Sequence, residues 1–101
     1  MGETRYRDPL AEDAVIDVYF LTRRGTVVEY VIVLLAREHG ELRAVRVYDN
    51  THQIHDMHRY NREGVKQPAE TFHQGSAGEA MRSAVDAVRK GYREMIESWR
   101  R

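Results

Sequence analysis

The residues most able to do chemistry lie in one short segment, residues 49–60. Its candidate catalytic residues are Asp49, His52, His55, His58 and Arg59. Histidines beside Asp49 or Asp56 could bind a zinc-like or iron-like metal. Alternatively, a histidine could act as a general acid or base near neutral pH while Arg59 steadies a phosphate group.

The spacing of the three histidines limits both chemistries. At intervals of three residues, His52, His55 and His58 form one slowly drifting stripe on a helix, whereas in an extended strand successive members change faces. They could therefore share one metal ion only if the segment is helical or bent. The zincin metalloprotease motif is absent. The sequence does not decide whether this segment binds a metal, and it predicts no cofactor. The simpler alternative is that the histidines are solvated polar residues on the exposed face of a strand.

Two further groups could take part in binding. His73 precedes the predicted helix and could fold toward the histidine segment, or it could simply bond to the backbone of its loop. A strip of basic residues, interleaved with tyrosines, could hold single-stranded nucleic acid. Its members would be Arg23, Arg24, Arg43 and Arg46. The alternative for this strip is an ordinary solvated sheet face.

The composition bounds the class of protein. The 101 residues suit one domain, and 16 basic residues balance 16 acidic ones, so that nucleic-acid binding would need a local patch. The absence of cysteine excludes disulfides and thiolate metal sites and is typical of a reducing compartment. The longest apolar run, Tyr30 to Ala36, is too short to span a membrane. We expect a cytoplasmic protein with no membrane partner.

The elements that must position these residues follow from periodicity. Alternating apolar residues predict strands over residues 14–21, 26–37 and 42–49, joined by short turns and therefore antiparallel. Ser76 and Glu79 have capping-box spacing and begin a helix predicted over residues 77–99. Its apolar stripe is Met81, Val85, Val88, Tyr92, Met95 and Trp99.

Residues 50–72 are open to two interpretations. The favoured one is a hairpin with strands near 53–60 and 65–72 around a loop at 61–64. The competing one is a short helix from Thr51 to Tyr60. The expected fold is thus α+β: an antiparallel β-meander of four to five strands packed on one long C-terminal helix. Residues 1–13 would form a flexible segment ahead of a single domain over residues 14–101.

The strand predicted over residues 26–37 is apolar on both faces, although one helix can cover only one of them. The second face would need the N-terminal segment or a partner chain. This pattern predicts a homodimer or a partner protein.

The run Val47-Tyr48-Asp49-Asn50-Thr51-His52 and the histidines that follow it resemble TumE-type toxins of toxin–antitoxin modules and related small bacterial and archaeal proteins. The resemblance implies a β-meander, a functional corner of Asp49, His52, His55 and His58, and a role directed at RNA or bound by an antitoxin. Lys66 lies farther from the histidines than the toxin pattern leads us to expect.

Three hypotheses for function follow, and whether the protein is an enzyme stays undecided. The first is a toxin-like protein acting on RNA through the histidine-rich segment. The second is a non-enzymatic, dimeric protein-interaction module. The third is a small metal-binding protein.

Overall fold

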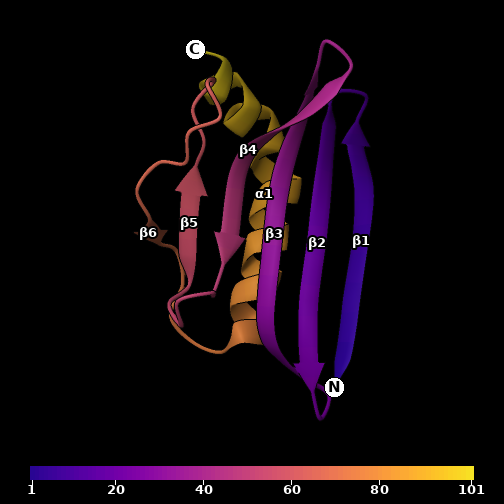
Figure 1. Ribbon diagram of the computed structural model, residues 1–101, viewed down its shortest axis with the longest axis vertical. Helices are drawn as coiled ribbons and strands as arrows, with labels where there is room; N and C mark the ends of the chain where they lie inside the picture. The colour runs from indigo at the N-terminus through magenta and orange to yellow at the C-terminus, as the bar shows by residue number, and fades with distance from the viewer.

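A computed structural model describes all residues, 1–101, as one six-stranded antiparallel sheet packed against one helix (Figure 1). The strands follow one another in sequence order across the sheet. They are β1 (Gly2–Ala11), β2 (Ala14–Arg23), β3 (Thr26–Glu38), β4 (Glu41–Asp49), β5 (Asp56–Arg59) and β6 (Glu70–Thr71), and the helix is α1 (Ala77–Arg100). The predicted α+β meander with a C-terminal helix is confirmed, but the predicted count of four to five strands was too low.

The additional strand is β1, in the segment that the sequence led us to expect as flexible. It pairs with β2 from Gly2 opposite Thr22 to Pro9 opposite Val15. Its side chains are mostly polar and exposed, so it carries no apolar alternation that would predict a strand. The backbone ladder holds it instead, and Pro9 is tolerated because β1 is an edge strand.

The strands β2, β3 and β4 form the predicted centre of the sheet. Short turns with positive φ angles at Arg24 and Gly25, and again at His39 and Gly40, force the antiparallel pairing. Alternate residues of these strands are fully buried against the helix: Ala14, Ile16, Val18, Tyr30, Ile32 and Leu34.

The hairpin interpretation of residues 50–72 is confirmed in outline, and the competing helix over residues 51–60 does not form. The Asn61 side chain accepts hydrogen bonds from the backbone N–H groups of Glu63 and Val65, and Gly64 has a φ of 82°. Both strands are shorter than predicted. The Asn50 side chain bonds to the backbone of β3, which ends β4 and sends the chain into a loop before β5 begins.

The helix begins as predicted, because the Ser76 side chain accepts a hydrogen bond from the backbone N–H of Glu79 at 3.2 Å. Its buried face is centred one residue away from the predicted stripe. The residues buried there are Ala80, Ala84, Val88, Ile96 and Trp99. Alanines at the first two positions let the helix approach the sheet closely. The helix does not combine the length and apolarity that crossing a membrane needs.

The helix covers only one side of the sheet, and in Figure 1 it lies behind β3 and β4. We call the opposite side the open face. The strand register assigns each residue to one side: Tyr48 and Met57, which are paired, lie in the core, so their neighbours Asp49 and Asp56 lie on the open face.

Candidate anion-binding site

The structure separates the residues that the sequence grouped as a catalytic segment. Asp49 and His58 lie on the open face, whereas Arg59 lies on the helix side of the sheet. His52 lies on an exposed loop, and His55 immediately precedes β5 and lies near the beginning of α1. The three histidines therefore do not converge, because a loop and then a strand, rather than a helix, carry them.

Each of the two partly buried histidines holds chain segments together. His55 Nε2 lies 2.9 Å from the carbonyl oxygen of Gly75, which can only accept, so Nε2 carries the proton. In the neutral ring, Nδ1 then accepts from the Tyr30 hydroxyl at 2.8 Å. His58 Nδ1 donates to the carbonyl oxygen of Gln67 at 2.8 Å. These bonds tie β3, β5 and the start of the helix together.

The side chain of His55 lies between two other rings, those of Tyr30 and His73. Its ring stacks on Tyr30 at a centroid distance of 5.8 Å and meets the ring of His73 edge-on at 5.9 Å. Burial, together with the negative charges of Asp49 and Asp56, raises the pKa of Tyr30, so the phenol stays protonated. His73 thus does fold toward His55, and its Nε2 is buried without a hydrogen-bond partner.

No cluster of three or more histidine, cysteine, aspartate or glutamate side chains is placed to hold a metal ion. Asp49 instead accepts a hydrogen bond from the backbone N–H of Thr51 at 3.2 Å, which is the turn-forming role that aspartate often plays.

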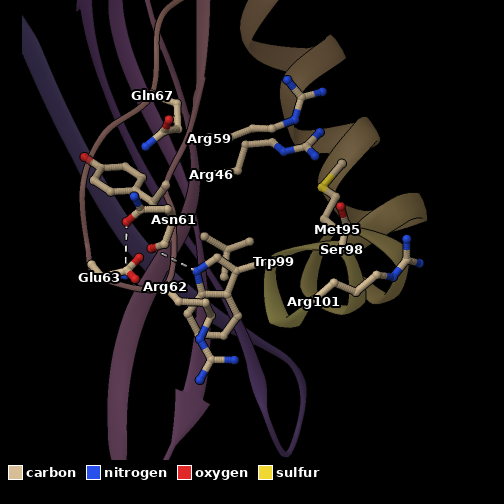
Figure 2. Close-up of a pocket in the computed structure, with 12 residues that line it drawn as sticks. Arg46, Arg59, Asn61, Arg62, Glu63, Gln67, Met95, Ser98, Trp99 and Arg101 are labelled. Carbon is tan, nitrogen blue, oxygen red and sulfur yellow. Dashed lines mark hydrogen bonds between the residues drawn. The ribbon is translucent and has the colours of Figure 1, made fainter.

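The arginines, rather than the histidines, line a cavity. A hollow of about 380 Å³ lies where β4, the 59–67 hairpin and the last turns of α1 meet (Figure 2). Four of its lining residues are Arg46, Arg59, Arg62 and Arg101, and Glu63 is its one acidic residue. No histidine lines it.

Two of these arginines form a cross-strand pair. Arg46 of β4 stands directly opposite Arg59 of β5, and Figure 2 shows both side chains extending in parallel toward α1. Like charges that face each other across a sheet repel. Arg59 forms an ion pair with Glu70, but Arg46 forms none, and its Nε is buried without a hydrogen-bond partner.

The remaining arginines near the cavity have other surroundings. Arg62 and Arg43 share Glu38 at 2.7 and 3.5 Å, and their guanidinium groups lie over the Trp99 ring at 4.4 and 5.4 Å. These contacts build the wall of the cavity. Arg101 extends from the end of α1 and points away from the cross-strand pair (Figure 2), so it belongs to the rim.

The basic strip predicted from Arg23, Arg24, Arg43 and Arg46 does not form. Arg23 pairs with Thr26 at one end of β3, whereas Arg43 pairs with Ala36 near the other end. Ten residues of strand separate these positions, which is about 33 Å. The sequence led us to expect that Arg59 could steady a phosphate, but not that Arg46 faces it. Strand alternation had placed Arg46 and Tyr48 on the same face of the strand. The pairing of Arg46 with Arg59, however, follows only from the register between β4 and β5.

The family model for a domain of unknown function (DUF7718) matches residues 1–101, so the chain belongs to that family. No curated protein and no solved structure matches the chain. The family match overturns the expected kinship with TumE-type toxins, which rested on about a dozen residues around the Asp49 corner. In that corner Asp49 forms a common turn, and His55 and His58 bond to backbone carbonyls.

Proposed function

We propose that this member of a family of unknown function binds phosphate esters in the arginine-lined cavity. The observation that carries the proposal is the cross-strand pair of Arg46 and Arg59, in which Arg46 has no counter-ion. A guanidinium group binds phosphate oxygens through two parallel hydrogen bonds, and its charge is retained at any physiological pH. An anion between the two side chains would relieve their repulsion.

The size of the cavity favours a ligand larger than inorganic phosphate. At about 380 Å³ it falls in the range of pockets that hold small organic ligands. The phosphate could belong to a phosphodiester of single-stranded RNA, one of the partners that the sequence suggested, or to a free mononucleotide. The cavity favours binding over cleavage, because none of its lining side chains is a histidine that could move a proton at neutral pH.

Tryptophan fluorescence can report binding directly, because Trp99, the single tryptophan of the chain, lines the cavity. We would titrate the purified protein with inorganic phosphate, adenosine monophosphate and a single-stranded oligoribonucleotide while recording tryptophan emission. A saturable change is expected, weakest for phosphate alone. Tighter binding of the oligonucleotide, with an affinity that falls steeply with salt, would identify RNA as the source of the phosphate.

Two variants and one control decide the result. Arg46→Met should abolish measurable binding and Arg59→Met should weaken it at least about tenfold, because each removes a charge-assisted contact. Arg82→Met removes an exposed charge from α1 outside the cavity and should leave binding unchanged. Equal binding by all three variants, or no saturable signal with any ligand, would contradict the proposal.

A second candidate function is protein interaction, and one observation favours it. The open face is apolar at its centre, and no element of the chain covers it (Figure 1). The two functions are compatible, because the cavity lies on the helix side of the sheet.

A further inference from the structure

The open face has an apolar centre made of alternate residues of the three central strands, β2, β3 and β4. Its central side chains are Val15, Tyr19, Val31, Val33, Leu35 and Val47. None of them belongs to the core cluster under α1. Four of the six stay partly exposed, and a shallow hollow over Tyr19, Val31 and Val33 is also lined by Arg5 and Asp17. Asp17 is the one charge within the centre, and Arg7 neutralises it. Antiparallel sheets usually bury an apolar face of this kind against a second layer.

Charged residues flank this apolar centre in a definite order. One row of directly paired residues runs across the sheet from β1 to β5: Arg5, Tyr19, Val31, Asp49 and Asp56. The basic end lies on β1 and the acidic end lies on β4 and β5. The row therefore has opposite charges at its two ends and apolar or aromatic groups between them.

The charges at both ends of the row lack ion-pair partners within the chain, and Asp49 accepts only the backbone N–H of Thr51. Arg5 forms no ion pair and lies over the Tyr19 ring at 4.9 Å. Asp49 and Asp56 face each other across two strands and form no ion pair, although they are only 6% and 9% exposed. Like charges placed directly opposite each other destabilise a sheet, so a cation from outside the chain would stabilise this pair.

We propose that a second copy of this chain covers the open face, with the two sheets packed face to face about a twofold axis parallel to β3. This inference rests on the second candidate function and is independent of phosphate binding. Rotation about such an axis exchanges the two sides of the sheet. It brings β1 of one copy over β5 of the other and leaves each β3 over its counterpart.

The rotation matches the unpaired charges. Arg5 comes to lie over Asp56 of the partner subunit, and Tyr19 comes to lie over Asp49 of the partner subunit. The Tyr19 hydroxyl, which donates to Glu3 at 3.4 Å within one chain, can then donate to that carboxylate instead. Val31 and Val33 pack against their own copies at the axis. Because the interface is isologous, each ion pair forms twice.

The open face is also large enough. The four long strands β1–β4, spaced about 4.8 Å apart and about 30 Å long, together with the short β5 present a projected area on the order of 600 Å². Stable interfaces bury about 800 Å² on each partner, and atomic relief makes the accessible area larger than its projection. Aligned packing of two sheets about 10 Å apart is a common arrangement.

Charge reversal tests this geometry. Sedimentation analysis of the wild-type chain from about 1 to 100 μM should show a dimer, an affinity range typical of such interfaces. Arg5→Glu makes both ends of the row acidic, and Asp56→Arg makes both ends basic, so each variant alone should dissociate at least about 100-fold more readily. Mixed in equal amounts, the two variants should form a heterodimer, because both contacts then bring opposite charges together: the unchanged Arg5 of one variant meets the unchanged Asp56 of the other, and the two substituted side chains form a pair of reversed polarity. Arg82→Glu, on the outer side of α1, is the matched control and should dimerise as the wild type does.

Several results would overturn the inference: a wild-type monomer throughout the range, unchanged dimerisation of Arg5→Glu, or variants that fail to recombine. Arg5 is exposed, so its variant is expected to fold, and its result decides alone if Asp56→Arg does not fold. The phosphate titration distinguishes this inference from the first proposal. Arg5→Glu should bind phosphate esters as the wild type does, and Arg46→Met should dimerise normally.

Discussion

Replacement of Arg46 by methionine is expected to stabilise the free protein while it abolishes phosphate binding. Methionine keeps an unbranched stem of similar length, so the packing of the side chain against β4 and α1 is largely retained. What disappears is a guanidinium group that has a buried, unpartnered Nε and faces Arg59 across the sheet.

The magnitude follows from these two features. An unsatisfied buried N–H group costs about 1–3 kcal/mol, and a like-charged cross-strand pair costs about 0.2–1 kcal/mol. Arg46 is only partly buried, so we take the lower ends of both ranges. The free energy of unfolding should rise by about 1 kcal/mol, which for a domain of this size raises the melting temperature by roughly 4–8 °C.

A bound ligand should reverse the order of stability of the wild type and Arg46→Met. At a phosphate-ester concentration about 100 times its dissociation constant, the wild type should gain about 2.7 kcal/mol, whereas Arg46→Met should gain almost nothing. The wild type, less stable than the variant without ligand, would then exceed it by about 1.7 kcal/mol. Urea denaturation followed by tryptophan emission, with and without adenosine monophosphate, measures all four values.

Two outcomes would refute this reasoning. If Arg46→Met lowers the free energy of unfolding by more than about 1 kcal/mol, the arginine stabilises the fold and its missing counter-ion carries no functional meaning. If both proteins gain equally from the ligand, the anion binds elsewhere. Arg82→Met, which changes the same residue type on an exposed helix surface, corrects for the general effect of lost charge.

The remaining predictions concern the fold. Tyr30→Phe should cost about 1–2 kcal/mol in urea denaturation, because His55 Nδ1 loses its hydrogen bond in a buried site. Since the pKa of Tyr30 is raised in the folded state, its contribution is complete below about pH 10 and is lost as the pH rises further. Alkaline denaturation should therefore be less steep in Tyr30→Phe, and an unchanged profile would contradict this. The hydrogen bond and charge of Arg93 lower the pKa of Asp13, so Asp13→Asn should cost less than about 1 kcal/mol, and only above about pH 4, as thermal melts at pH 3 and pH 7 would show. Ala84→Leu should destabilise by about 1–3 kcal/mol, because the fully buried methyl group leaves no room against the sheet, and a stabilised variant would disprove the close packing of α1.

The centre of the sheet could be predicted from the sequence because β2, β3 and β4 alternate clearly and are joined by short turns. Strand β1 could not be predicted, because backbone hydrogen bonds to β2 and ion pairs hold it in place. One such ion pair joins Asp8 to Arg89, which is distant in sequence. The helix boundaries were predictable from its cap. Its buried face was misplaced by one residue because large side chains outweighed Ala80 and Ala84, whose small size lets the helix pack closely.

The candidate site could be predicted only in part. Arg59 was a candidate phosphate ligand in the sequence, but its cross-strand neighbour Arg46 is 13 positions away. Their pairing depends on where the chain re-enters the sheet after the loop at residues 50–55. Histidine spacing was a misleading guide to geometry. A loop contributes His52 and a strand contributes His58, so equal spacing in sequence does not produce a common site.

The two proposed surfaces lie on opposite sides of one sheet, and this arrangement has a consequence for binding. In a face-to-face dimer both helices point outward, and each copy keeps its own cavity open to solvent. An oligoribonucleotide of a few nucleotides would bind each copy independently, whereas one long enough to pass around the edge of the sheets would engage both cavities and gain affinity through effective concentration. Arg5→Glu, which leaves the cavity intact, should therefore bind the short oligonucleotide as the wild type does and lose affinity only for the long one. Equal affinities for both lengths in the wild type would mean that the two cavities are not used together, whatever the oligomeric state.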